Sequence, residues 1–129
     1  MTTNDVAQQL VALCREGKNR EALETLYSEN IVSIEGAGGP EMPQRMEGLE
    51  AVRGKTEWWY ANHEVHEVTT EGPYIAEGDD RFLVKFWIDV TPTGGERMQM
   101  PEMALYTVAD GKIVEERFYF NPADMPGAG

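Results

Sequence analysis

Two carboxyl groups stand out because each lies inside an otherwise apolar, strand-like stretch. Asp89 follows the run FLVKFWI, and Glu102 lies within the segment MPEMA. A carboxyl group moved from water into an apolar environment has a raised pKa, because desolvation disfavours its charged form. Such a group suits general acid–base catalysis near neutral pH. These two residues are therefore the first candidates for chemistry.

The two histidines of the chain, His63 and His66, lie among glutamates where a helical pattern gives way to a strand pattern. Zinc-binding helices place two histidines four residues apart on one face, whereas here the spacing is three, so no metal site is predicted. His63 alone is a candidate proton shuttle. The alternative is an imidazole that hydrogen-bonds the last carbonyl groups of the preceding helix.

The elements that must position these residues follow from the hydrophobic periodicity. We expect a helical hairpin over residues 4–28, a short strand over 31–35, a third helix over 48–63, and strands over 64–76, 81–91, 96–108 and 112–120. Glycine-containing turns separate the last four strands, as in antiparallel neighbours. Helices followed by strands predict an α+β fold, with the N-terminal helices in the concave face of a strongly curved antiparallel or mixed sheet. We expect residues 1–129 to form a single domain with a core over about 4–121 and a loose tail over 122–129.

The net charge argues against some classes of binding partner, and the cysteine content indicates the cellular compartment. The chain has 23 acidic and 11 basic residues and a net charge of −12, which argues against nucleic acid or an anionic membrane as partner. No apolar stretch approaches the roughly 20 residues that a membrane-spanning helix needs, and the N-terminus does not resemble a signal peptide. The one cysteine, Cys14, excludes an internal disulfide and favours the reducing cytoplasm.

Four segments carry a family resemblance. They are GLEAVR at the start of the third helix, WIDV at the end of one strand, and DGKI leading into ERFYF. Over residues 6 to 121 the chain resembles the SnoaL-like family, within the superfamily named after nuclear transport factor two. The resemblance implies a cone-shaped, cystatin-like roll that forms homodimers. It also implies either cofactor-independent reactions, such as those of polyketide cyclases, ketosteroid isomerase and dehydratases, or binding without turnover.

The resemblance also implies which residues face the cone. Asp89 falls where limonene epoxide hydrolase has a catalytic aspartate, which would place Lys85, Trp87 and Asp89 inside. Phe118 and Trp87 replace two other catalytic residues of that enzyme, so its mechanism is not expected here. Glu102 lies either beside Asp89 in the pocket or on the exposed convex face. The candidate ligand-binding residues are Trp58, Lys85, Trp87, Met100, Tyr106 and Phe118.

Two functions follow as hypotheses. In the first, the cone holds a small apolar or aromatic molecule, and Asp89 acts as general acid or base in a lyase, isomerase or cyclase without a cofactor, with Glu102 or His63 as its partner. The pKa of Asp89 would then exceed the usual value of about 3.9. In the alternative, the chain is a ligand-binding or dimerisation module without turnover, and Asp89 is solvated or paired with Lys85. A homodimer through the outer sheet surface would cover Leu105 and Tyr119.

Overall fold

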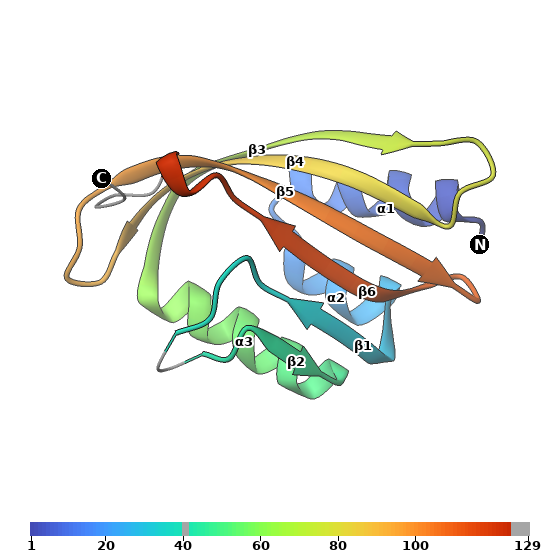
Figure 1. The fold of residues 1–129 in the computed structure, drawn as a ribbon, viewed down its shortest axis with the longest axis horizontal. Helices are drawn as coiled ribbons and strands as arrows, with labels where there is room; N and C mark the ends of the chain where they lie inside the picture. The colour runs from blue at the N-terminus through green and yellow to red at the C-terminus, as the bar shows by residue number, and fades with distance from the viewer. Residues whose placement is uncertain (40–41, 125–129) are drawn as a thin grey trace.

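The computed structural model describes residues 1–39 and 42–124 (Figure 1). Along the chain it contains α1 (Thr3–Arg15), α2 (Asn19–Leu26), β1 (Tyr27–Ile34), β2 (Arg45–Glu47), α3 (Leu49–Asn62), β3 (His63–Ile75), β4 (Arg81–Pro92), β5 (Met98–Ala109) and β6 (Lys112–Tyr119). A short 3-10 helix, η1 (Pro122–Asp124), follows. Of the predicted tail, 122–124 form this turn, and 125–129 lie outside the described residues.

The helices begin and end where local chemistry predicts. The hydroxyl of Thr2 accepts a hydrogen bond from the backbone N–H of Asp5, and the Asp5 carboxylate accepts one from the backbone N–H of Thr2, which is a capping box. Gly17, with φ of +72°, follows the end of α1 and allows the sharp turn into α2. The expected hairpin therefore forms, although Tyr27 belongs to β1 rather than to the helical face predicted for it.

The six strands form one mixed sheet in the order β2-β1-β6-β5-β4-β3. The pairs within the meander from β3 to β6 are antiparallel, and β1 pairs with β6 in parallel. The β5–β6 hairpin turns at Asp110 and Gly111, both with positive φ, which two-residue hairpin turns require. The short strand β2 was not predicted.

The sheet arches over the helices (Figure 1). α1 packs against β3 and β4, and α3 packs against β1 and β3. The predicted α+β architecture with helices in the concave face is therefore confirmed, and the sheet stays open rather than closing into a barrel. Within the described residues, no helix is both long and apolar enough to cross a membrane.

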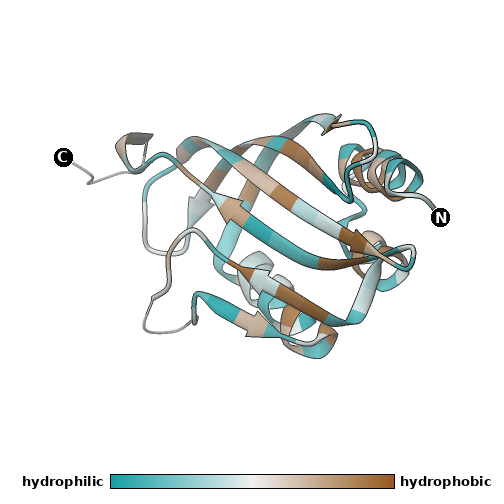
Figure 2. Ribbon diagram, turned by 45° about the vertical axis from the view of Figure 1, so that its right-hand side comes forward, coloured by the Kyte–Doolittle hydropathy of each residue, from teal (hydrophilic) through white to brown (hydrophobic). Residues whose placement is uncertain are grey.

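The two faces of β4 are the reverse of what the resemblance implied. Phe82, Val84 and Phe86 are 1%, 0% and 7% exposed and belong to the core beneath the sheet, whereas Trp87 is 43% exposed on the outer face. The β4–β5 register continues without a shift from Arg81 to Val90, so no bulge inverts the alternation. Figure 2 shows hydrophobic segments along the strands of the sheet. The wholly apolar face packs on the helices because it loses most by contact with water.

Candidate functional site

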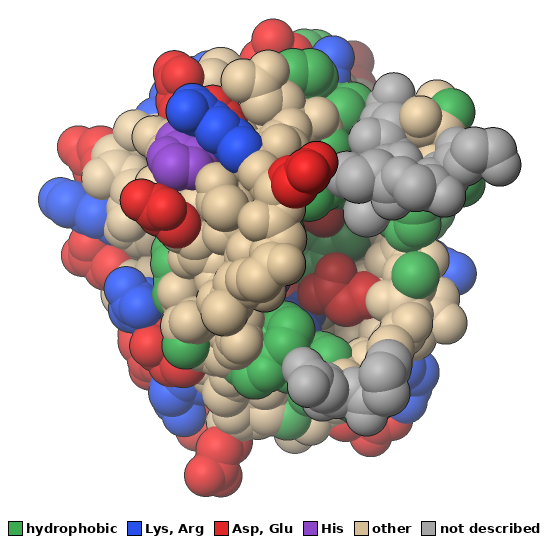
Figure 3. Space-filling view, turned by 90° about the vertical axis from the view of Figure 1, so that its left-hand side faces the viewer, with side chains coloured by type: hydrophobic (Ala, Val, Ile, Leu, Met, Phe, Trp, Pro, Cys, Tyr) green, Lys and Arg blue, Asp and Glu red, His purple; other side chains and the backbone are tan. Residues whose placement is uncertain are grey.

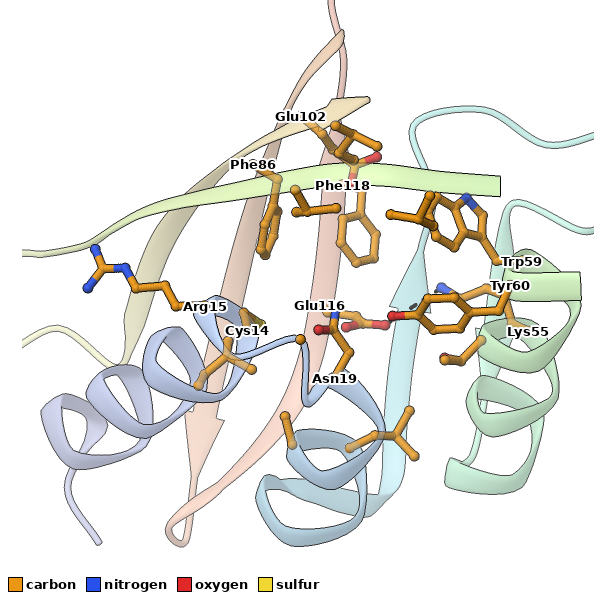
Figure 4. Close-up of a pocket in the computed structure, with 18 of the residues that line it drawn as sticks. Cys14, Arg15, Asn19, Lys55, Trp59, Tyr60, Phe86, Glu102, Glu116 and Phe118 are labelled. Carbon is orange, nitrogen blue, oxygen red and sulfur yellow. Dashed lines mark ion pairs between the residues drawn. The ribbon is translucent and has the colours of Figure 1, made fainter. Parts of the chain in front are cut away.

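A cavity of about 530 Å³ lies between the helices and the concave face of the sheet. Phe86 and Phe118 extend into it from the sheet, and Trp59 and Tyr60 approach from α3 (Figure 4). Most of this wall is apolar or aromatic, as in the binding sites of small organic molecules. A buried group of polar side chains lies around Glu116, and other polar residues of the lining come from α1 and β3.

Glu116 is the centre of a buried hydrogen-bond cluster. It is 3% exposed and extends from β6 into the cavity wall (Figure 4). The hydroxyl group of Tyr27 donates a short hydrogen bond to its Oε2, and Ser33 Oγ donates one of 2.8 Å to its Oε1. Burial and the negative charge of Glu116 raise the pKa of Tyr27 well above its usual value. The carboxylate is therefore satisfied by groups that stay protonated.

Lys55 of α3 brings a positive charge to the same cluster. Its Nζ donates hydrogen bonds to Ser33 Oγ and, at 2.6 Å, to Glu35 Oε1. The same nitrogen lies 3.6 Å from Glu116 Oε1. The Lys55 side chain is only 11% exposed. One ammonium group thus stabilises two carboxylates, and its hydrogen atoms face groups already present in the protein.

Glu102 lies in the cavity wall without such support. It projects from the inner face of β5, opposite Phe86 in the register and close to Phe118 (Figure 4). Among the described residues, no group donates a hydrogen bond to its carboxyl group or forms an ion pair with it. Burial and the nearby negative charges of Glu35 and Glu116 raise its pKa to about 8, although Lys55 acts in the opposite direction. At neutral pH, Glu102 therefore carries a proton within the cavity.

Cys14 of α1 also lines the cavity and is 8% exposed. Burial, together with the charge of Glu116, raises the pKa of its thiol to about 12. Because the thiolate is the nucleophilic form of cysteine, the thiol is unreactive at neutral pH.

The expected position of Asp89 is wrong. Its carboxylate accepts two hydrogen bonds from Arg97, of 2.9 and 2.8 Å, and a third of 3.2 Å from Gln99. It does not line the cavity. The hydrogen bonds from Arg97 lower its pKa to about 2, the opposite of the predicted shift. The physical reason is that Asp89 lies on the outer face of β4, where the turn after that strand brings a counter-charge to it.

The other predicted site residues lie in several different parts of the structure. Tyr106 and Phe118 line the cavity, as predicted, and so does Glu102. Met100 lies opposite Ile88 in the register but does not line the cavity, and Lys85 and Trp87 lie on the outer face. The placement predicted for these last two is wrong, because they alternate with the buried residues of β4.

Trp58 and His63 line a second, smaller hollow of about 410 Å³, which shares Glu35, Lys55 and Trp59 with the main cavity. His63 Nδ1 lies 2.7 Å from the carbonyl oxygen of Trp59, and the two rings stack. This is the helix-end hydrogen bond that was the alternative to a proton shuttle. Figure 3 shows a hollowed face, with acidic side chains deep among hydrophobic ones.

Sequence reasoning missed Glu116, Tyr27, Ser33, Lys55 and Glu35 as site residues. One signal was present: Glu116 alternates with Phe118 on a face that is otherwise apolar. A carboxylate in such a position needs partners, because an unpaired buried charge is costly. The partners come from β1 and α3, so only the tertiary fold reveals them. In the described part of the chain, no group of three metal-ligating side chains is present.

The chain matches the family model described as SnoaL-like domain over residues 1–120. This protein belongs to the SnoaL-like family. It is similar to a Mesorhizobium loti protein that carries the provisional assignments SnoaL-like polyketide cyclase and carbohydrate phosphatase, with 44% identity over 93% of this chain and 100% of that chain, and a TM-score of 0.87. Among curated proteins, the chain finds no match.

More distant structures share the fold. A computationally designed 17-OHP binder is 20% identical over 96% of this chain and 97% of its own, with a TM-score of 0.72. A Catenulispora acidiphila protein with a ketosteroid isomerase-like fold, in complex with trimethylamine, is 22% identical over 95% of this chain and 90% of its own, with a TM-score of 0.71. Both likenesses show that the fold is shared.

Proposed function

We propose that this SnoaL-like protein binds a small, mainly apolar or aromatic molecule in its cavity and transfers a proton to or from it through Glu102. The reaction class is a lyase, isomerase or cyclase that needs no cofactor. The observation that carries the proposal is a carboxyl group in a largely apolar cavity, with no hydrogen-bond partner among the described residues and a pKa of about 8. A general acid or base works best when its pKa lies near the working pH.

The geometry supports different roles for the two carboxyl groups Glu116 and Glu102. Glu116 accepts hydrogen bonds from Tyr27 and Ser33 and lies 3.6 Å from Lys55, so it is bound to protein groups. Glu102 keeps its proton, because burial and the nearby Glu35 and Glu116 raise its pKa, and it can donate this proton to a carbonyl or leaving oxygen of the ligand. After the transfer, Glu102 is a carboxylate that can remove a proton from a neighbouring carbon atom. Different environments that separate two pKa values are the usual arrangement for acid–base pairs.

The test uses a panel of neutral aromatic and terpenoid ketones. Binding is detected by NMR shifts of cavity residues, and chemistry is detected as exchange of the hydrogen atoms next to the ketone carbonyl with deuterium from the solvent. We expect a bound ketone to exchange faster with the native protein than with Glu102→Gln. Asp89→Asn, on the outer face, is the matched control and should behave as the native protein does. Equal exchange with native protein and Glu102→Gln would refute the catalytic role.

A second candidate is binding without turnover. This candidate is favoured by the hydrogen bonds that connect Glu116, Tyr27, Ser33 and Lys55 to one another. These bonds form a rigid wall, and a structural role is enough to explain that wall. Under this alternative, ketones bind in the cavity but no exchange follows. The same experiment therefore separates the two candidates.

We further propose a homodimer through the outer face of the sheet. Trp87 and Tyr119 are 43% and 44% exposed there, Met103 of β5 lies opposite Tyr119, and Leu105 follows Met103 on the same face. Exposed apolar groups that adjoin one another favour contact with another protein surface. Light scattering at micromolar concentration should give the mass of a dimer, and Trp87→Glu should give a monomer. A monomer mass for the native protein would refute the dimer.

A further inference from the structure

The charges of the cavity do not balance. Its described lining includes five carboxyl groups and two cationic side chains (Glu16, Glu35, Glu67, Glu102, Glu116; Arg15, Lys55). Glu16 forms a salt bridge with Lys18 at the rim, at 3.6 Å. In the interior, three carboxyl groups share one ammonium group. That group, on Lys55, is already bonded to Ser33 and Glu35. Arg15, the other cation, lies at the rim, where it donates a hydrogen bond to the carbonyl oxygen of Thr70. A ligand with a negative charge would therefore meet repulsion in the interior of the cavity.

Aromatic rings line the cavity that holds Glu102, whose carboxyl group has no partner among the described residues. Glu102 lies close to Phe118, and Phe86, Trp59 and Tyr60 complete the wall on the sheet and helix sides (Figure 4). The face of the Phe118 ring already receives a cation, since Lys55 Nζ lies 5.2 Å from its centroid. Aromatic faces attract cations through their quadrupole, most strongly where water is excluded. An unpaired carboxyl group among such faces is the arrangement that recognises an ammonium group.

We propose that the cavity selects organic cations, in which a small apolar or aromatic body carries a quaternary or protonated amine placed against Glu102. The proposal rests on the proposed function in using the same cavity, and it specifies the class of ligand. When the cation binds, the carboxyl group of Glu102 releases its proton to the solvent and becomes the counter-ion, so with such a ligand Glu102 starts as the base of the proposed function and not as the acid. Binding is therefore linked to the loss of one proton and becomes tighter as the pH rises toward 8.

Several other ionisable groups lie near Glu102, so the pH dependence of cation binding must be assigned to the right group. Glu35, just beyond β1, Lys55 on α3 and Glu116 on β6 influence its protonation. Tyr106 on its own strand and Cys14 on α1 face the same space, and burial raises the pKa of both, so they stay neutral in the relevant range. His66 and Glu67 on β3 and Arg15 at the end of α1 line the rim. Only a variant at Glu102 can separate its proton from theirs.

The experiment compares benzyltrimethylammonium with its uncharged carbon isostere, 2,2-dimethylpropylbenzene. Neither probe titrates, so any pH dependence of binding comes from the protein. Tryptophan fluorescence and NMR shifts give the dissociation constants between pH 5.5 and 9. For the native protein we expect the affinity for the cation to rise about tenfold per pH unit below pH 8 and then level off, because each bound cation displaces one proton. The affinity for the isostere should not change with pH.

Variants assign the effect to Glu102. Glu102→Gln should bind the cation at least about tenfold more weakly at pH 8.5 and without the rise, while its affinity for the isostere is unchanged. Asp89→Asn removes a negative charge from the outer face and should bind both probes as the native protein does. If Glu102→Gln does not fold, Glu102→Met, which puts an apolar side chain of similar length in the same place, is compared with the native protein in the same pH series.

Two outcomes would overturn the proposal. If the isostere binds and the cation binds no more tightly at pH 8.5, the cavity is a ligand site but does not select cations, and the proposed function survives. If neither probe nor any ketone of the panel binds, both this inference and the proposed function fail.

Discussion

Asp89 and Glu102 lie on neighbouring strands of one sheet, but they lie on opposite faces of it and their pKa values are shifted in opposite directions. Asp89 faces outward, where Arg97 donates two hydrogen bonds to it and lowers its pKa to about 2. Glu102 faces inward, where nothing among the described residues donates to it and burial raises its pKa to about 8. Both lie in apolar stretches of sequence. The difference teaches that the available partners, and not the apolar neighbours along the chain, decide which carboxyl group keeps its proton.

The largest expected effect tests the assignment of the two faces of β4. Phe82→Ala should lower the free energy of unfolding by about 3–5 kcal/mol, because it leaves a hole in a close-packed core. Trp87→Ala, on the outer face, should cost less than about 1 kcal/mol in the isolated chain. Urea denaturation measures both. Equal losses for the two variants would mean that the faces have been assigned wrongly.

The next effect concerns the pH dependence of stability. An unfolded Glu102 ionises near 4.5 and the folded one near 8, so between these values the folded state binds one more proton. The free energy of unfolding should then fall by about 1.4 kcal/mol per pH unit as the pH rises through this window. Glu102→Gln lacks this contribution. Its stability relative to the native protein should therefore improve steadily from pH 5 to pH 7, and a constant difference would contradict the raised pKa.

Removing the buried carboxylate should have a smaller effect. Glu116→Gln should cost about 2 kcal/mol, because Tyr27 and Ser33 lose a charged acceptor and Lys55 loses a neighbouring charge. Glu115→Gln is the matched control on the same strand and should change stability by less than about 0.5 kcal/mol. Guanidinium denaturation at pH 7 compares the two. A loss as small for Glu116→Gln as for the control would show that the cluster does not stabilise the fold.

The smallest effect belongs to the outer carboxylate. Asp89→Asn should cost less stability at pH 7 than Glu116→Gln does, because Arg97 is 60% exposed and water screens the pair. Since its folded pKa is depressed, Asp89 contributes stability above its ordinary value of 3.8 and loses it as the pH falls toward 2. Native and variant stabilities should thus converge in acid. A difference that persists at pH 2 would contradict the ion pair.

The sequence predicted the architecture well because helix and strand periodicities are local. The capping residues near Thr2 and the turn at Asp110 and Gly111 each determine a boundary by themselves. The predicted face of β4 was wrong because a family resemblance at Asp89 was given more weight than the unbroken apolar alternation from Phe82 to Ile88. The alternation was the better physical guide, since it records which residues avoid water.

The site was only partly predictable for a different reason. The side chain of Glu102 had two possible directions in the sequence, and only the sheet register, with Phe86 opposite, places it in the cavity. The cluster around Glu116 unites residues that are 83 and 89 positions apart in the chain, Ser33 and Tyr27. No local pattern encodes such pairings, so they emerge only when β1 pairs with β6.

The most direct test is the titration of Glu102 itself. Carbon-13 NMR of the side-chain carboxyl groups over a pH series, with Glu102→Gln to assign the signal, gives its pKa in the native protein. We expect a midpoint near 8 for Glu102, together with one near 2 for Asp89. A midpoint near 4.5 for Glu102 would mean that it is ionised at neutral pH without a ligand, and the account of the cavity as an acid–base site would be contradicted.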